Sequence, residues 1–151
     1  MKYYIFVNLL CSFLIFSNAN AKEDCVHDIS NLKCLEYVKV KNADTAIFNI
    51  PHLHHLLGKE IKISLLDIKS PSVYSRNKCA KEVAKKARSL IRDIYKNSKN
   101  IKAIDVKRDK SFALKGKIIV DDKDIAKILL KKKYAAPVKE FKKIDWCKVK
   151  P

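Results

Sequence analysis

The chain has 151 residues, carries 33 lysines and arginines against 16 acidic residues, and is 48% hydrophobic with only 2 glycines and 4 prolines. This composition excludes a disordered or low-complexity chain, and the length leaves room for one compact domain. The net charge of +17 favours a polyanionic partner such as nucleic acid, anionic lipid or a cell-wall polymer.

The first 21 residues have the pattern of a secretory signal. An apolar stretch over residues 3–16 follows Lys2, and Ala19 and Ala21 are the small residues that signal peptidase requires. We expect a mature protein that begins at Lys22, is secreted or periplasmic, and has no transmembrane anchor. A retained anchor is the alternative, but the stretch is short for a bilayer and no basic cluster follows it.

Cysteine usage indicates an oxidising compartment. If Cys11 leaves with the signal, an even number remains, which predicts two disulfides; the four are Cys25, Cys34, Cys79 and Cys147. Three pairings are possible, and loop economy favours Cys25 with Cys34 and Cys79 with Cys147. A zinc site of Cys25, His27 and Cys34 competes with the first bridge, although its spacing matches no standard zinc pattern.

The mature chain begins with strand patterns and then changes period. Strands are expected over residues 35–40, 45–50 and 61–68, with a loop over 51–59. Apolar residues with helical spacing then predict a long helix over residues 80–97. Strand composition returns over 101–107 and 112–120, with a charged hairpin turn at 107–111, and Asp121–Asp122 is expected to cap a second helix that starts near Ile125.

This order of elements predicts an α+β fold, a five-stranded OB-type β-barrel with two to three helices packed outside it. The expected organisation has four parts. They are a signal at residues 1–21, a disulfide-closed extension at 22–34, the barrel domain at 35–138, and a tail at 139–151 that Cys147 tethers.

Motifs in series resemble those of the staphylococcal nuclease-like (thermonuclease) domains over residues 35–147. Residues 41–45 resemble the Asp-Gly-Asp-Thr loop, and residues 63–72 resemble the strand end Arg-Leu-x-Gly-Ile-Asp-Thr-Pro-Glu. The later matches come in the same order as in the family: Lys78–Cys79 before the long helix, residues 108–114, residues 120–125, and the closing Trp146–Cys147.

The resemblance implies phosphodiester cleavage with a calcium ion held by two Asp, a Glu that assists the attacking water, and two Arg that neutralise the transition state. The matching positions here are Asp44 and Lys69 for the metal ligands, Ser72 for the Glu, and Ser64 and Ala113 for the two Arg, while Asn42 replaces the first Asp of the loop.

Only Asp44 keeps its chemistry, so we expect no catalytic residue, no metal or other cofactor, and no nuclease activity by this mechanism. Calcium would be the cofactor if the family activity persists. One hypothesis is that Lys69 fills the cation position and pairs with Asp44. The other is that Lys69 points into solvent and Asp44 caps a turn.

Basic residues give the expected partner surface for nucleic acid or another polyanion; they are Lys85, Arg88, Arg92, Lys107, Arg108, Lys110, Lys115 and Lys117. The leading prediction is therefore an exported, catalytically inactive nuclease-like domain that binds a polyanion. A weak metal-dependent phosphodiesterase with a rebuilt site and an envelope-associated interaction protein are the alternatives.

Two further motifs have competing interpretations. The cluster His52, His54 and His55 is interpreted as a surface loop rather than a metal site. Trp146, beside Cys147, is interpreted as a packing residue over a disulfide rather than as a base-stacking platform.

Overall fold

The structure is a computed structural model, and it describes residues 25–149. The expected signal sequence at residues 1–21 lies outside these residues. Between residues 25 and 149, no helix has the length and the apolar character that are needed to cross a membrane.

The strands form one mixed sheet in the order β1-β2-β3-β6-β5. Neighbouring strands are antiparallel except β3 and β6, which run parallel. Two shorter pairings complete the strand set: β7 adds to β6, and β4 pairs with β8 in a separate small sheet. The bounds are β1 (Glu36–Asn42), β2 (Thr45–Asn49), β3 (Ile61–Leu65), β4 (Ile68–Lys69), β5 (Ile101–Arg108), β6 (Leu114–Val120), β7 (Lys123–Asp124) and β8 (Ala136–Pro137).

The segment before β1 pairs with β5 at the far edge of the sheet. The amides of Leu32 and Leu35 donate to the carbonyls of Ala103 and Ile101, each at 2.8 Å, and the Ala103 amide donates back to the Leu32 carbonyl. Because this segment runs directly into β1, these bonds bring the two ends of the strand order together, as a barrel requires. The extension expected at residues 22–34 thus contributes backbone pairing to the barrel.

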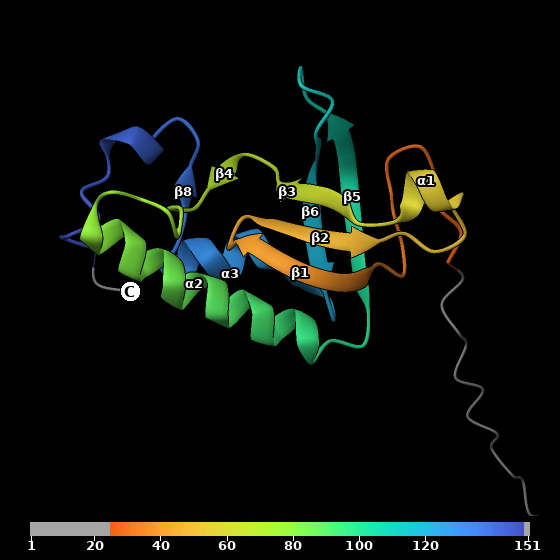
Figure 1. Cartoon of the computed structure of the whole chain (residues 1–151), viewed down its shortest axis with the longest axis horizontal. Coiled ribbons are helices and arrows are strands. Elements are labelled where there is room, and N and C mark those ends of the chain that lie inside the picture. Colours follow the sequence, from red (N-terminus) through yellow and green to blue (C-terminus); the bar gives the residue numbers. More distant parts are fainter. Residues whose placement is uncertain (1–24, 150–151) are drawn as a thin grey trace, which may run out of the picture.

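Helix α2 (Lys78–Lys96) runs along one side of the strands (Figure 1). It starts where the Asn77 side chain accepts a hydrogen bond from the Ala80 amide at 3.0 Å, which satisfies one of the free amides of the first turn. Its buried residues follow the predicted stripe, from Ala80 to Tyr95. The long helix is therefore confirmed.

The core lies between α2, the sheet and the short helix α3 (Ile125–Lys131). Its fully buried side chains include Phe48, Ile63, Ile91 and Leu129. The Tyr95 ring packs edge-on against Phe48, with centroids 5.3 Å apart, and burial raises the pKa of the Tyr95 hydroxyl well above its ordinary value.

Two turn predictions need correction. Asp124, not Asp121–Asp122, caps α3, since its carboxylate accepts from the Ala126 amide at 2.8 Å. Asp121 and Asp122 both have positive φ and form the tight turn that folds β7 back onto β6. The hairpin turn expected at residues 107–111 lies later, because β5 continues to Arg108 and β6 begins only at Leu114.

Two segments expected to be irregular contain short elements. The loop over residues 51–59 holds one helical turn, α1 (His55–Gly58). The short strand β8 lies just before the expected tail and pairs with β4, and the tail itself holds a 3₁₀ turn, η1 (Phe141–Lys143), whose Phe141 packs beside α2. Figure 1 shows α1 at one end of the molecule, and η1 and the start of α2 at the other.

Both predicted disulfides are confirmed, Cys25–Cys34 and Cys79–Cys147. They indicate an extracellular or otherwise oxidising compartment. The zinc alternative at Cys25 and Cys34 is wrong, because the two sulfurs bond to each other. His27 is also engaged elsewhere: its Nδ1 accepts from the Lys33 amide, so its Nε2 carries the proton and donates to the Pro51 carbonyl at 2.6 Å.

Candidate functional site

A groove of about 1320 Å³ opens between the β1–β2 turn, the β3–β4 segment, the start of α2 and the C-terminal tail. The main chain of β4 and β8 holds the tail in place, since Ile68 pairs with Pro137 and Lys69 with Ala136. The Cys79–Cys147 disulfide fixes the end of the tail on α2. The groove contains Asp44, Ser64, Lys69 and Ser72, which are positions that the resemblance assigns to catalysis.

Asp44 is tied into the protein through both carboxylate oxygens. Oδ2 accepts from the Ser70 amide at 2.8 Å, and Oδ1 accepts from the Thr45 hydroxyl at 3.1 Å. The Asp44 amide in turn donates to Ser70 Oγ at 3.2 Å. Asp44 therefore clips the β1–β2 turn to the end of β4. This goes beyond the expected role of Asp44 as a turn cap, because Ser70 is 26 positions away in the sequence.

Ser64 extends the same hydrogen-bonded chain. Its hydroxyl lies 3.1 Å from the Thr45 hydroxyl. Because Thr45 donates to Asp44, Ser64 is the donor in this second contact. At this position the family has an arginine that stabilises the transition state. This protein has instead the short, neutral Ser64 hydroxyl, which bonds to its neighbour on the sheet.

Lys69 does not pair with Asp44. Its ammonium lies 5.2 Å from the centre of the Phe141 ring, and no ion pair connects it to a carboxylate within the described part of the chain. The ring face carries negative charge density, which attracts the cation. The pairing hypothesis is wrong, and Lys69 instead joins β4 to the tail across the groove.

The other two family positions have structural contacts. Ser72 Oγ accepts from the Tyr74 amide at 3.2 Å and forms a turn before α2. Ala113 lies in the β5–β6 turn, where its amide donates to the Asp109 carboxylate at 3.0 Å. Neither side chain can act as a base or as a cation.

The oxygen donors of the groove do not fit the calcium ion that the family uses. Both oxygens of Asp44 already accept hydrogen bonds, and Lys69 stands at the second carboxylate position. Asp67 also lines the groove, but residues 25–149 contain no group of three or more His, Cys, Asp or Glu placed to hold a metal ion. His52, His54 and His55 therefore form no such group either. His54 instead caps α1 by accepting a hydrogen bond from the Leu56 amide through Nδ1.

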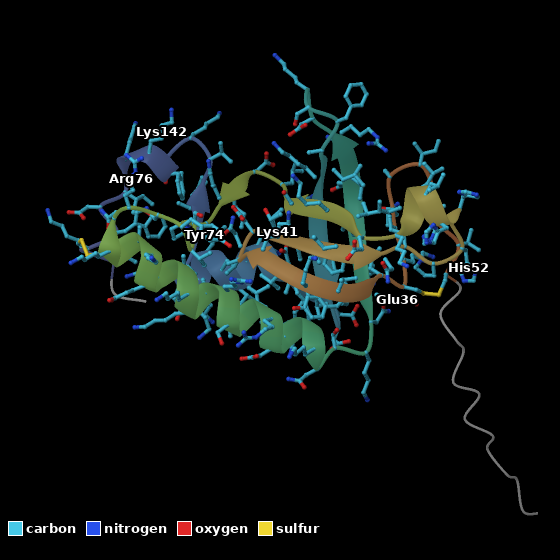
Figure 2. The ribbon with its side chains drawn as sticks, in the orientation of Figure 1. Glu36, Lys41, His52, Tyr74, Arg76 and Lys142 are labelled. Atoms are coloured by element: carbon cyan, nitrogen blue, oxygen red, sulfur yellow. A yellow bond between two sulfur atoms is a disulfide. The ribbon has the colours of Figure 1, made fainter. Side chains whose placement is uncertain are left out.

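Cationic side chains surround this site. Lys69, Lys115, Lys139 and Lys142 line the groove, against the two carboxylates of Asp44 and Asp67. Tyr74, which is 86% exposed, adds an aromatic face. Figure 2 shows Tyr74 and Lys41 near the middle of the molecule, with Arg76 and Lys142 together at one end.

The predicted basic surface is divided into two. Lys85, Arg88 and Arg92 lie on α2, whereas the other five residues lie on the β5–β6 hairpin, on the opposite side of the molecule (Figure 1). The eight residues therefore lie on two separate parts of the molecule. Of these eight residues only Lys115 lines the groove.

Several of the predicted residues already have partners. Lys117 bonds to Asp105 at 2.6 Å, and this hydrogen bond lowers the pKa of Asp105 and raises that of Lys117. Lys115 lies 3.2 Å from Asp109. Hydrogen bonds from the Ser111 hydroxyl and amide, and then from Lys115, hold the pKa of Asp109 well below its ordinary value.

Two arginines on or near these surfaces bond to main-chain carbonyls. Arg88 Nε donates to Val40 at 3.2 Å, and Arg108 Nη1 donates to Phe112 at 3.0 Å. The groove residues Lys139, Lys142 and Phe141 were not among the sequence candidates. The Cys147 tether was the available signal, since a tail that is bonded to α2 must place its own lysines against the domain.

The family model described as "staphylococcal nuclease homologue" matches residues 62–146, which is more than half of the chain. The chain belongs to this family. The match runs from β3 to Trp146 and so includes the β3–β4 segment, α2 and the tail that surround the groove. A search of the curated proteins finds no match.

Trp146 is part of the tail's own small core. It is 8% exposed, packs against Ala80 and Val83 of α2, and lies 5.6 Å from the Phe141 ring. It is thus a packing residue beside the disulfide, as the sequence predicts. It also packs against Phe141, the ring that contacts Lys69.

Proposed function

We propose that this member of the family is an exported protein that binds nucleic acid, or another polyanion with closely spaced phosphates, in the groove and does not cleave it by the family's metal-dependent mechanism. The observation that supports the proposal is that Lys69, Ser64 and Ser72 replace acidic and guanidinium positions in a groove with lysines on opposite walls, while Ala113 replaces the second guanidinium position in the β5–β6 turn. Family membership supports nucleic acid as the class of ligand.

Binding has a direct physical basis. Lysines on β4, β6 and the tail approach the groove from different directions, so a phosphate backbone that follows it meets several cations in succession. Each cation that neutralises a phosphate releases condensed counterions, which makes the affinity depend on salt. Tyr74 offers an exposed ring on which a base can stack without sequence preference.

The residues that the family's cleavage mechanism requires are missing. The donor set at Asp44 and Lys69 does not suit a hard divalent cation. Ser72, at the position of the Glu, cannot act as the base that activates water. Lysines supply charge, but they do not supply the planar bidentate contact of a guanidinium to a phosphoryl group. The removal of such preorganised donors costs orders of magnitude in rate.

The binding experiment is a salt titration with a fluorescently labelled single-stranded oligonucleotide. We expect log Kd to rise linearly with log salt concentration, and the double variant Lys139→Ala/Lys142→Ala to weaken binding and reduce the slope by about 1 to 2. Lys85→Ala on α2 is the matched control and should change neither value. Binding that is independent of salt would contradict the proposal and favour the envelope-associated interaction protein.

A weak phosphodiesterase remains the second candidate, because Asp44 and Asp67 keep two carboxylates in the groove. Its test is a plasmid and single-stranded DNA cleavage assay with calcium or magnesium. We expect no turnover above that of the Asp44→Ala variant. Turnover that Asp44→Ala abolishes would establish the enzyme and overturn the inactive assignment.

A further inference from the structure

The loop between β5 and β6 carries one exposed aromatic ring. This loop, residues 109–113, is here called the hairpin tip, and Figure 1 shows it projecting beyond the rest of the molecule. Its Phe112 is 77% exposed. Within the described residues, no other large apolar residue of β5, β6 or the hairpin tip is exposed.

The main chain of the hairpin tip is held in a shape that a phenylalanine disfavours. Phe112 has a φ of 60°, in the left-handed region that bulky residues rarely adopt. Its amide donates to the Asp109 carbonyl at 2.9 Å, and the Asp109 carboxylate accepts from the Ser111 hydroxyl at 2.6 Å and from the Ala113 amide at 3.0 Å. Because the ring stays exposed, it gains little burial that would offset the strain. Folding of the hairpin therefore does not account for a phenylalanine at this position.

The hairpin has an excess of positive charge around this ring. Residues 105–117 include two acidic residues, Asp105 and Asp109, and five basic ones, which gives a net charge of +3; the basic residues are Lys107, Arg108, Lys110, Lys115 and Lys117. The two carboxylates lie in ion pairs with Lys117 and Lys115.

One cation is fixed beside the ring itself. Arg108 Nη1 donates to the Phe112 carbonyl at 3.0 Å. Lys107, Arg108 and Lys110 are all exposed, and none of them forms an ion pair with a carboxylate between residues 25 and 149. Two further carboxylates, Asp67 and Asp124, act on Lys117 in the middle of β6. The hairpin tip therefore presents an aromatic ring together with uncompensated cations.

Lys115 connects the hairpin to the groove. It lines the groove, and it pairs in register with Ser64 of β3, which lines the groove as well. Phe112 is three positions away in the sequence, so the two Cα atoms are at most about 11 Å apart. A polymer that contacts Lys115 in the groove therefore has the ring within reach of its neighbouring units.

A single ring among cations distinguishes among the possible partners. Docking to a bilayer or to a second copy needs a contiguous apolar surface, whereas the other residues of the hairpin tip are Asp109, Lys110, Ser111 and Ala113. Stacking on a base needs only one exposed ring, with cations nearby for the phosphates. A polyanion without bases would use the cations and leave the ring without a contact.

We propose that Phe112 stacks on an unpaired base of a nucleic-acid strand that continues from the groove past Lys115, while Arg108 and Lys110 contact its phosphates. This inference rests on the proposed function, and it narrows the ligand from polyanions in general to single-stranded nucleic acid. The bases inside a duplex are stacked on one another, so a duplex offers the ring no free face along its length.

The test is fluorescence anisotropy with three labelled probes of equal length, which are a single strand, its duplex, and an abasic strand that keeps the phosphates. Phe112→Gly removes the ring, and glycine accepts a positive φ without strain, so this variant should keep or raise the Tm. We expect it to bind the single strand about fivefold to a hundredfold more weakly, as the loss of one base–aromatic contact does. Its affinity for the duplex and for the abasic strand should not change.

Two further variants are the controls. Phe112→Trp keeps an aromatic face and should bind the single strand at least as tightly as the unchanged protein does. Leu57→Ala removes a leucine with 68% exposure from α1, at the other end of the molecule, and should change the affinity for none of the three probes.

The groove variant keeps this inference separate from the proposed function. Lys139→Ala/Lys142→Ala should weaken the single strand and the abasic strand alike. If it weakens neither while Phe112→Gly still weakens the single strand, the groove assignment fails and the hairpin contact stands.

Three outcomes would overturn the stacking inference. One is an unchanged single-strand affinity for Phe112→Gly. Another is an equal loss on the single and abasic strands, because the ring would then serve only the shape of the hairpin. The third is a loss of binding to anionic lipid vesicles without any change in single-strand affinity, because the ring would then contact a membrane.

Discussion

The two ends of the molecule are each braced by one disulfide, yet they present opposite chemistry. At the groove end, Cys79–Cys147 spans 68 positions and fixes a tail that brings lysines and an aromatic ring to a polar site. At the opposite end, called here the α1 end, Cys25–Cys34 spans 9 positions and shapes one turn beside exposed leucines. The long bridge assembles a site from distant segments, whereas the short one braces a local segment.

The largest expected difference between the ends is in stability. Cys79→Ala/Cys147→Ala should lower the free energy of unfolding by about 4 kcal/mol, and Cys25→Ala/Cys34→Ala by about 3 kcal/mol, because the longer loop restricts the unfolded chain more. Urea unfolding measures both values.

Oligonucleotide affinity should differ more clearly between the two disulfide variants than stability does. Only the loss of Cys79–Cys147 frees the tail, so only that variant should lose oligonucleotide affinity under conditions where it is still folded. Equal losses of affinity in both variants would show that the tail does not form the groove wall.

Gly58→Ala tests the α1 end alone. The new methyl group would meet the Ile50 carbonyl at 2.6 Å, so the loop must shift, at a cost of about 1–3 kcal/mol in the free energy of unfolding. Gly116→Ala, whose Cβ would lie 3.0 Å from a flexible Val106 methyl and 3.1 Å from the Ile104 carbonyl oxygen, is the milder control. A smaller loss of stability for Gly58→Ala than for Gly116→Ala, measured by urea unfolding, would show that the α1 loop is not rigidly held.

Lys69→Ala addresses the groove end with a smaller effect. It removes the contact to Phe141 and should cost under about 1 kcal/mol of stability, while weakening oligonucleotide binding several-fold. Lys69→Arg keeps the charge over the ring and should restore both properties in thermal unfolding and binding assays. Unchanged binding by Lys69→Ala would place the ligand elsewhere.

The smallest effect expected is a pH dependence in the β5–β6 hairpin. The pKa of Asp109 is depressed in the folded protein, so its contribution is present above the unfolded pKa of about 4 and is lost as pH falls toward the folded pKa. Asp109→Asn should therefore lower Tm at pH 6, and the gap from the unchanged protein should shrink steadily below pH 4. A gap that is constant with pH would mean that the carboxylate charge is not involved.

Local patterns were sufficient for much of the fold. The helical stripe from Ala80 to Tyr95, the alternation around Ile63 and the cysteine spacing each reflect a short-range rule of periodicity or loop closure, and the structure confirms what they predict. Most of the positions that the family motifs identified line the groove, namely Asp44, Ser64, Lys69 and Ser72, whereas Ala113 does not.

Only the tertiary structure decided where side chains and segment ends go. The direction of Lys69 depends on Phe141, which is 72 positions away in the sequence, and the role of Asp124 as a cap depends on how β7 folds onto β6. The pairing of Leu32 with Ala103, and the lysines that the tail brings to the groove, likewise depend on contacts between distant segments. Sequence spacing determines periodicity within an element, but it carries no information about which distant group a flexible side chain or a terminal segment will meet.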